Sequence, residues 1–418
     1  MKAKILLLTV GYNDSDANSI CARNVAEELY SRGNVVDMCC IKKSISNVDG
    51  QTSFGKLFYV LNEYTKILCK LEQKGISFLQ LPKLIRYAIK MKQRIKSIGY
   101  TRTGNQYGDT IIRKDFYAAV QRNQMSGNYD VIVAIAQPFG WAVLANELKE
   151  RYPGTKIYLY MLDPYIYNYT LSRNKIEYRK RQFERFTNNL DGIIFTRGIK
   201  EEAEKHNYAI RKKSIIVDLP NMIPHKTVQT KNYLDKIELM FAGRFYPDIR
   251  NPQKMFNVLL QILDEQTIFS MFSRGCDAMS NAFAQSCPHV KQMDFLPHEK
   301  YVKYFEGVDI LVNLENTIPN QLPSKVFEYI ASGKPIINFY EDENSMGVHY
   351  FGRYPLAFNF NLNHYQTSDI IHLRNFIAES VGKRLTYDEA TALMQEARAE
   401  NVLNVIADFI MADLGYNN

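Results

Sequence analysis

The sequence predicts an α/β protein built from two doubly wound, Rossmann-like parallel sheets. Short apolar runs of strand length alternate with helical periodicity in both halves of the chain, and a proline-containing linker separates the halves. At roughly 100–200 residues per domain, the 418 residues correspond to two or three domains. We expect the boundary at Pro220-Asn221-Met222-Ile223-Pro224, where prolines and a polar stretch interrupt the alternation.

The first half opens with a β-loop-α-β unit. An apolar strand at residues 5–10 ends at Gly11, a helix at 19–32 ends at Gly33, and a second strand spans 35–41. We predict further strands at 130–136, 156–162, 192–195 and 214–217, with helices at 141–151, up to about 189, and 199–206. Residues of about 54–124 interrupt this alternation, and we interpret them as a helical insertion.

The second half repeats the alternation. We predict strands at 237–242, 267–272, 290–295, 309–313 and 336–339, with helices at about 252–263 and 299–305. Pro323-Ser324 begins one more helix and Gly333-Lys334-Pro335 ends it, because Ser and Pro favour helix starts and Gly-x-Pro stops them. Late helices are expected at about 369–381 and 386–414.

These elements divide the chain into three parts. Residues 1–221 form an N-terminal domain that carries the insertion at about 54–124, and residues 222–395 form a C-terminal domain. We expect the helix at 396–418 to pack back on the N-terminal domain. Ligands of such sheets bind at the carboxyl ends of the strands, near the point where the strand order reverses. Two facing sheets would place a cleft between the domains.

Composition favours a cytoplasmic protein. The apolar run at residues 1–10 is too short for a signal peptide, and no apolar stretch approaches the roughly 20 residues that span a bilayer. The six cysteines lack metal-ligand spacing and are expected to be reduced. The formal charge of +8 does not demand nucleic acid, but basic residues are concentrated between Lys83 and Arg122. That stretch is either a patch for anionic lipid or a phosphorylated acceptor, or a solvated helix face.

Several other chemistries lack their residue patterns. The seven histidines show no metal-ligand spacing, and Asp14-x-Asp16 lies on the first loop of a doubly wound sheet, so we predict no metal site. Glycine-rich phosphate loops and a nucleophile elbow are absent from the sequence. Five tyrosines between Tyr158 and Tyr169 are expected in packing or as a sugar platform rather than in base stacking.

The segment at residues 322–335 combines several features of an anion site. A strand, a polar loop and a helix start succeed one another, which directs backbone N–H groups towards the space above the sheet. Lys325 adds a cation on the first helical turn, where it opposes the helix dipole and therefore indicates an anionic partner. Glu328 lies one turn further on, within reach of a ribose or a base.

Ordered motifs in the second half resemble the retaining GT-B glycosyltransferases, especially glycosyltransferase family 4 in its bacterial polysaccharide-assembly form. Pro220-Asn221 is similar to the interdomain crossing of the family, and Gly243-Arg244 to its strand followed by Gly-Arg. Val308-Asp309-Ile310 is similar to the strand before the donor loop, and the segment from Glu328 to Pro335 to the Glu-Ala-Met-Ala-x-Gly-x-Pro segment.

The resemblance implies a nucleotide-sugar donor bound by the C-terminal domain. Arg244 matches the first basic residue that holds the diphosphate, whereas Ile249 occupies the place of the second, so that Arg250 or Lys254 substitutes for it. Glu328 matches the ribose-binding glutamate. Asn320 replaces a glutamate that touches the donor sugar, which leaves the sugar end less well supported than the ribose end. The predicted donor-binding residues are Gly243, Arg244, Arg250, Lys254, Leu296, Asn316, Asn320, Gln321, Leu322, Ser324, Lys325 and Glu328.

The N-terminal domain is expected to bind the acceptor. Gly11 resembles the glycine loop after the first strand of the family, and Asn13 and Gln137 lie on loops of the same kind. Asp163 follows the strand at 156–162 and is the candidate for orienting or deprotonating an acceptor hydroxyl. A plain turn at Gly11 and a simple helix-cap role for Asp163 are the alternatives.

The predicted activity is therefore transfer of a sugar from a nucleoside diphosphate to an acceptor hydroxyl with retention, a hexosyl- or related transferase of EC class 2.4. The resemblance implies front-face attack without a metal or other cofactor. It also implies a saccharide or lipid-linked acceptor at the inner face of the cell membrane. Two alternatives stay open: a nucleotide-sugar 2-epimerase or hydrolase on the same fold, and a catalytically degenerate sugar-nucleotide-binding assembly protein. Donor sugar, base, acceptor, linkage and oligomeric state have no sequence signal.

Overall fold

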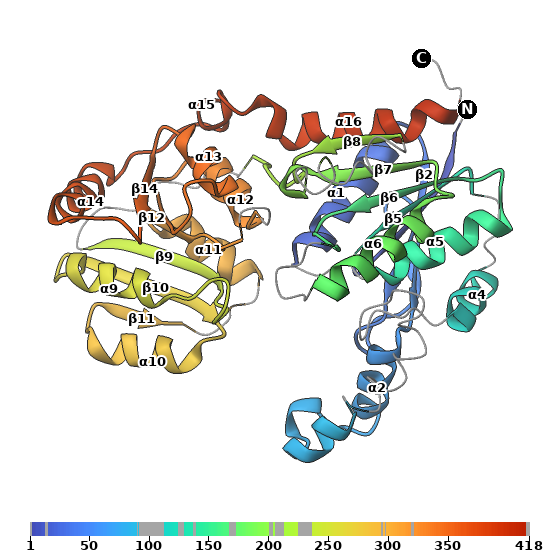
Figure 1. Ribbon diagram of the computed structural model, residues 1–418, viewed down its shortest axis with the longest axis horizontal. Helices are drawn as coiled ribbons and strands as arrows, with labels where there is room; N and C mark the ends of the chain where they lie inside the picture. The colour runs from blue at the N-terminus through green and yellow to red at the C-terminus, as the bar shows by residue number, and fades with distance from the viewer. Residues whose placement is uncertain are drawn as a thin grey trace. The chain divides into compact units, whose positions relative to one another are not determined.

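The chain folds into two compact units (Figure 1). The computed structural model describes residues 2–12, 16–89, 91, 113–123, 129–136, 139–166, 173–199, 204, 213–224, 236–293, 296, 298–318 and 322–414. Unit 1 comprises Met1–Pro220 with Glu400–Asn418, and unit 2 comprises Asn221–Ala399. The division falls within the predicted linker, next to Pro220, whose carbonyl accepts a hydrogen bond from Asn24 Nδ2 at 2.7 Å.

Unit 1 contains an eight-stranded sheet in the order β3-β4-β2-β1-β5-β6-β7-β8. Its strands are β1 (Lys4–Thr9), β2 (Val35–Ile41), β3 (Gly50–Gln51), β4 (Lys56–Val60), β5 (Val131–Ile135), β6 (Lys156–Met161), β7 (Gly192–Thr196) and β8 (Ser214–Val217). They pair in parallel, except that β3 is antiparallel to β4. The strand order reverses between β1 and β5, which is where doubly wound sheets bind ligands.

Helices cover both faces of this sheet because successive strand side chains point to opposite faces. Ile5 and Leu7 pack with α1 (Ala17–Ser31) and α16 (Ala399–Met411), whereas Leu6 and Leu8 pack with α4 (Arg113–Arg122), α5 (Gly140–Arg151) and α6 (Arg173–Thr187). Figure 1 shows α5 and α6 side by side on the second face. The predicted return of the C-terminal helix to the N-terminal sheet is confirmed, since Val402, Ile406 and Ile410 are buried in the same hydrophobic cluster as Ile5 and Leu7.

Unit 2 contains a six-stranded parallel sheet in the order β11-β10-β9-β12-β13-β14. Its strands are β9 (Ile237–Arg244), β10 (Thr267–Arg274), β11 (Val290–Gln292), β12 (Ile310–Leu314), β13 (Ile336–Tyr340) and β14 (Ala357–Asn361). In chain order within the unit, this arrangement is 3-2-1-4-5-6, the order of a dinucleotide-binding Rossmann sheet. The reversal lies between β9 and β12.

The helices of unit 2 are mostly short. They are α9 (Gln253–Ile262), α10 (Asp277–Ser286), α11 (His298–Gly307), α12 (Lys325–Ala331), α13 (Met346–Gly352), α14 (Thr367–Ser380) and α15 (Tyr387–Thr391). Residues of α9, α10 and α14 share one buried cluster with Leu239 and Phe241 of β9. The predicted stop of α12 at Gly333 is confirmed: Gly333 has φ +70°, and a Cβ there would lie 2.0 Å from the Leu385 carbonyl oxygen.

Several segments differ from the sequence prediction. The insertion at about 54–124 contains β4, which pairs with β2, and the helices α2 (Glu63–Glu72) and η1 (Phe78–Gln80). The helix expected at 386–414 is divided into α15, η3 (Gln395–Ala397), α16 and η4 (Ala412–Leu414). Elements α10, α13 and β14 had no predicted counterpart. Two further short helices complete the described set: η2 (Arg197–Ile199) in unit 1 and a helical segment at residues 83–89.

Among the described residues, no helix is both long enough and apolar enough to cross a bilayer.

Candidate functional site

The loops that follow β9 and β12 meet at the carboxyl edge of the unit 2 sheet. The two strands are hydrogen-bonded neighbours, with Val312 opposite Phe241. Beyond the strands, Thr317 N donates to the Ile249 carbonyl at 2.8 Å, which joins the two loops directly. Tyr246 and Arg250 close the β9 loop through a short antiparallel bridge. The two loops are therefore joined at the reversal of strand order, which presents the side chains of both together.

Two arginines predicted to hold a diphosphate lie on the β9 side of this junction. Arg244 is the exposed last residue of β9, and its guanidinium lies 5.7 Å from the centre of the Tyr246 ring. Arg250 is partly buried, with its Nη1 3.5 Å from the Arg244 carbonyl oxygen. The guanidinium also faces Gly243, since a Cβ at that position would lie 3.8 Å from Arg250 Nη1. The side chains of Arg244 and Arg250 thus both lie at the Gly243-Arg244 motif.

Lys254, the other predicted substitute for the second basic residue, points elsewhere. It lies on the first turn of α9, where its Nζ pairs with the Glu341 carboxylate and donates to Asn363 Oδ1 at 2.6 Å. Its charge is therefore compensated by the protein. Burial lowers the pKa of Arg250, and the negative charge of the Glu315 carboxylate partly opposes this lowering. Arg250 Nε has no hydrogen-bond partner among the described residues. Arg250 therefore remains the candidate with hydrogen-bonding capacity to spare.

Glu315 lies on the β12 side of the junction and is 5% exposed. Its Oε1 accepts a hydrogen bond of 2.7 Å from Asn313 Nδ2. The same amide nitrogen donates to Asn338 Oδ1 at 2.7 Å, and Asn338 Nδ2 donates to Asn359 Oδ1 at 2.8 Å. These three asparagines occupy matched positions on β12, β13 and β14. An amide ladder therefore crosses three strands and ends on the Glu315 carboxylate.

Gly347 makes room for that carboxylate. A Cβ at position 347 would lie 1.8 Å from Glu315 Oε1, closer than any two such atoms approach. Burial raises the pKa of Glu315 to about 7, an effect that Arg250, Asn313 and Ser345 partly oppose. Glu315 is thus a buried acid with a pKa near neutral pH. Its charged neighbour is Arg250, which is predicted to bind the diphosphate.

Helix α12 carries a compact cluster of Lys325, Glu328 and Tyr301. Lys325 Nζ lies 2.8 Å from Glu328 Oε2 and 2.7 Å from the Tyr301 hydroxyl, which in turn donates to Glu328 Oε1 at 3.2 Å. The ammonium group also lies 4.6 Å from the centre of the Tyr301 ring. The carboxylate raises the pKa of Lys325 against the effect of burial. Both Glu328 oxygens therefore take part in this cluster, Oε1 with Tyr301 and Oε2 with Lys325.

The remaining predicted donor residues have different surroundings. Asn316 follows Glu315 and is buried, whereas Leu322, Ser324 and Leu296 are partly exposed. Ser324 precedes α12 without a side-chain cap, and this helix is only seven residues long. Asn320 and Gln321 lie outside the described residues.

The comparisons with known proteins agree at the level of the fold. No model of a known protein family matches the sequence, and no curated protein matches it. Among solved structures, sucrose-phosphate synthase from Thermosynechococcus elongatus is 13% identical, with a TM-score of 0.62 and complete coverage of both chains. A glycosyltransferase from Rickettsia africae is 10% identical, with a TM-score of 0.55 and complete coverage of both. The lipopolysaccharide outer core galactosyltransferase WaaB is 12% identical, with a TM-score of 0.54, covering 99% of this chain and 100% of its own.

The fold is GT-B. Both sheets have the doubly wound topology that the GT-B prediction required.

Unit 1 carries the predicted acceptor residues at the carboxyl edge of its GT-B sheet. Gly11 is buried two residues after β1, and the loop is held by Arg23 Nη1, which donates to the Tyr12 carbonyl at 3.0 Å. Asp163 is partly buried two residues after β6. Asn13 and Gln137 lie outside the described residues. Asp16 caps α1 by accepting from Ser19 N at 3.0 Å, which gives this acid a structural role.

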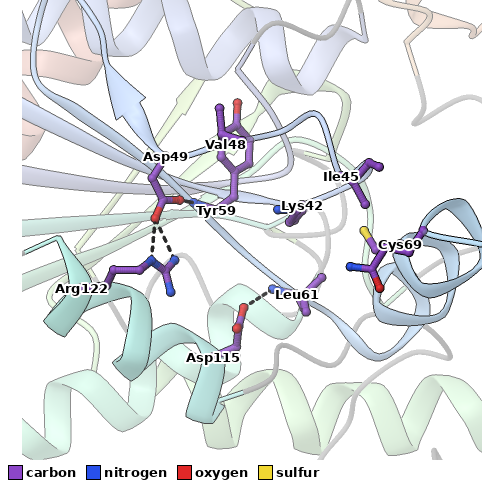
Figure 2. A pocket seen from close by; sticks show the side chains of 10 residues that line it. Lys42, Ile45, Val48, Asp49, Tyr59, Leu61, Cys69, Asp115 and Arg122 are labelled. Atoms are coloured by element: carbon purple, nitrogen blue, oxygen red, sulfur yellow. Dashed lines mark hydrogen bonds and ion pairs between the residues drawn. The ribbon is translucent and has the colours of Figure 1, made fainter.

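A pocket of about 460 Å³ opens at the same edge of unit 1, beyond β2 and β4 (Figure 2). Lys42 follows β2 directly and Leu61 follows β4 directly. Asp49 accepts hydrogen bonds from Tyr59 N and Arg122 Nε, both at 2.9 Å, and Asp115 accepts one from Leu61 N at 2.6 Å. The complete lining is Lys42, Ile45, Val48, Asp49, Tyr59, Leu61, Cys69, Gln73, Asp115 and Arg122.

The pocket combines charged groups with an apolar rim. Figure 2 shows Asp49, Arg122 and Asp115 along one side, Ile45 and Cys69 at the opposite side, and Val48 beside Asp49 and Tyr59. Val48 is 68% exposed, so its side chain is available to a ligand. Donors, acceptors and apolar carbon together suit a hydroxyl-rich ring, which has polar edges and apolar faces.

Sequence reasoning missed Glu315, Tyr301 and the pocket. A signal for the first existed: Asn313 and Asn338 are isolated amides inside otherwise apolar strand runs, and buried amides require partners. No comparable signal marked the pocket, because β4 and α4 supply its walls from within the irregular insertion. Among the described residues, no group of histidines, cysteines or acids has the arrangement of a metal site.

Proposed function

We propose that the protein is a glycosyltransferase that moves a sugar from a nucleoside-diphosphate sugar to a saccharide or lipid-linked acceptor hydroxyl, with retention of anomeric configuration. The observation that carries the proposal is that Arg244 and Arg250 lie together at the point where the strand order of the unit 2 sheet reverses. Guanidinium groups bind phosphate oxygens with charge-assisted hydrogen bonds, and the carboxyl edge at this reversal is the ligand site of Rossmann sheets. The ordered family 4 motifs support a retaining enzyme of EC class 2.4.

The donor occupies the junction of the β9 and β12 loops. Arg244 and Arg250 hold the diphosphate, with Lys325 as a third cation nearby. Glu328, kept in place by Lys325 and Tyr301, accepts hydrogen bonds from the ribose hydroxyls. Asn316 and Asn320 serve the donor sugar in place of the missing glutamate.

The chemical step separates the sugar C1–oxygen bond while the acceptor oxygen forms the new bond on the same face of the ring. The departing diphosphate gains negative charge, which the two arginines stabilise more strongly than in the ground state. The acceptor proton passes to the leaving phosphate oxygen. These side chains supply the positive charge, so that neither a metal nor an organic cofactor is part of the proposed reaction.

The acceptor binds at the carboxyl edge of unit 1. Gly11 lies in the loop after β1 and Asp163 follows β6, while Asn13 and Gln137 follow β1 and β5 in the sequence. Asp163 orients the acceptor hydroxyl. The pocket beside Lys42 and Asp115 accommodates a more distant sugar ring of a saccharide acceptor, since its volume suits a ring-sized ligand with hydroxyl groups.

Anionic membrane lipid is the second partner in the proposal. The helical segment at residues 83–89 exposes Leu84 by 83% and Tyr87 by 62%, next to the exposed cation of Lys83. Apolar side chains flanked by cations favour the headgroup region of an anionic bilayer. Sedimentation with phosphatidylglycerol–phosphatidylcholine vesicles tests this contact. Leu84→Asp should reduce the bound fraction severalfold, whereas Leu393→Asp, at a site 62% exposed in unit 2, should not. Equal binding of the two variants would remove the membrane from the proposal.

One assay separates the proposed function from its alternatives. The protein is supplied with UDP-glucose, UDP-galactose, UDP-N-acetylglucosamine and GDP-mannose, with and without a lipid-linked saccharide extract. Nucleoside diphosphate release and product mass are followed, and the anomeric configuration of the product is read by NMR. Acceptor-dependent transfer with the anomeric configuration of the donor is the expected result. Isomerised or hydrolysed donor without acceptor would indicate an epimerase or hydrolase, and binding without turnover a degenerate binder.

A further inference from the structure

Glu315 lies at the same junction as the two arginines, yet the donor-binding roles leave it without a function. Its carboxyl group is almost completely buried, at the end of the amide ladder and against Gly347. The loop that carries it is tied to the loop of Arg250 by the Thr317–Ile249 hydrogen bonds. A buried acid is unfavourable unless its surroundings compensate it, and a neutral hydrophobic residue would cost less there. The junction therefore retains an acid beside its phosphate-binding cation.

We propose that Glu315 is a positioning residue for Arg250: as a carboxylate it draws the guanidinium inwards, and on taking up a proton it leaves the guanidinium to the donor diphosphate. The inference rests on the proposed function, because it requires a diphosphate at Arg250. The proton comes from solvent and stays on a Glu315 oxygen while the donor is bound. No other bond changes in this step.

The direction of the coupling follows from charge. A diphosphate beside Arg250 adds negative charge close to Glu315, which disfavours the carboxylate and raises its pKa. In the ligand-free protein the pKa of Glu315 is already raised to about 7 by burial. Donor binding near neutral pH should therefore be accompanied by proton uptake, and the donor should bind less tightly as the pH rises.

The surroundings of the pair contain few competing groups. Asn313 of β12 and Ser345 before α13 face Glu315 and are neutral. Tyr246 and Tyr329 face Arg250, and burial raises the pKa of Tyr329 further from neutrality. Along the ladder, Asn338 and Asn359 are amides without a titrating proton. Among these described neighbours, Glu315 is the group whose protonation changes near pH 7.

Calorimetry in two buffers of different ionisation enthalpy tests the inference. The probes are UDP-glucose and GDP-mannose, whose diphosphate diesters carry no proton that titrates near neutrality. Near pH 7 the native protein should take up a fraction of a proton per donor bound, because burial places the pKa of Glu315 near that pH and the diphosphate raises it further. Glu315→Gln should bind the donor without uptake, and its dissociation constant should be nearly independent of pH. Glu341→Gln, which removes the carboxylate that pairs with Lys254, is the matched control and should retain the native uptake.

The outcomes separate the inference from the proposed function. Equal proton uptake by the native protein and Glu315→Gln would overturn the role of Glu315 and leave the donor site standing. Failure of the native protein to bind either probe or any other nucleotide sugar would overturn both. If Glu315→Gln does not fold, Asn313→Leu takes its place. Loss of the Asn313 hydrogen bond should shift the midpoint of proton uptake to higher pH, and an unchanged midpoint would count against the inference.

Discussion

Lys325 Nζ lies 2.8 Å from Glu328 Oε2, one turn along the same short helix. The two side chains are 31% and 29% exposed, and an i,i+3 ion pair with such solvent access contributes only about 0.3–0.5 kcal/mol. A double-mutant cycle of Lys325→Gln and Glu328→Gln should therefore show little coupling in unfolding free energy. Donor binding should respond differently, because in the proposed complex Lys325 contacts the phosphates and Glu328 the ribose. The Lys325→Gln variant should bind nucleotide sugar about tenfold more weakly, roughly 1.4 kcal/mol.

The control for this cycle is Lys303→Gln, which removes an exposed lysine from the helix that carries Tyr301. Its donor affinity should equal that of the native protein. If Lys325→Gln binds donor as tightly as Lys303→Gln does, Lys325 has no contact with the phosphates.

Arg250 and Lys254 should differ in their effect on donor binding. A charge-assisted hydrogen bond contributes about 1.5–3 kcal/mol, so Arg250→Ala should weaken the affinity for nucleotide sugar roughly ten- to hundredfold. Lys254→Ala should leave the affinity within about twofold, because that lysine is occupied by Glu341 and Asn363. Titration calorimetry of both variants measures the contrast. The reverse order would show that Lys254 is the second phosphate ligand.

Glu315 should make stability depend on pH in a defined direction. Its folded pKa of about 7 lies above the reference value of 4.5, so the folded state holds the proton more tightly than the unfolded chain. Its stabilising contribution is present below pH 4.5 and is lost as the pH rises towards 7. The total change is about 3 kcal/mol at 1.36 kcal/mol per unit. Glu315→Gln should remove this slope.

Urea unfolding of unit 2 at a series of pH values measures that slope. Glu379→Gln, on the exposed side of α14, controls for the loss of one negative charge. Parallel stability curves for Glu315→Gln and the native protein would mean that Glu315 titrates at an ordinary pH.

Gly333 and Gly352 form a matched pair for the backbone. Gly333 combines φ +70° with a close approach to the Leu385 carbonyl, whereas nothing lies within 4 Å of a Cβ at Gly352. Gly333→Ala should lower the unfolding free energy by roughly 2–4 kcal/mol, the sum of a left-handed conformation and a backbone clash. Gly352→Ala should be neutral or slightly stabilising. Similar unfolding midpoints for the two variants would contradict the described turn.

The sequence predicted the sheet strands well where each was an isolated apolar run, as at residues 5–10 and 237–242. It missed β4, although Leu57 to Val60 is a short apolar run, because we interpret residues of about 54–124 together as one helical insertion. It missed β14 because Phe358 and Phe360 alternate with asparagines, one of which has a partner only on the neighbouring strand. Fold class depends on many such runs together, so these omissions did not alter it.

The candidate site was predictable to a smaller extent. Arg244 follows from its position after a strand and a glycine. The difference between Arg250 and Lys254 could not be predicted, because it depends on the Tyr246–Arg250 bridge and on the distant Glu341. Glu315 was missed since acids after a strand are usually solvated, and its burial depends on Gly347.

The place of α16 in unit 1 has a consequence for biosynthesis. Unit 2 is continuous in sequence, whereas unit 1 is made of two segments of the chain. The hydrophobic cluster of unit 1 that contains Leu7 and Val25 is completed by Ile406 and Ile410 from the C-terminal segment. At roughly 5–20 residues per second, translation takes on the order of ten seconds or more to pass from Pro220 to Glu400. During that interval the nascent N-terminal sheet lacks its last helix, and a chaperone that shields apolar surface should associate with the chain until residues 400–414 can pack on the sheet.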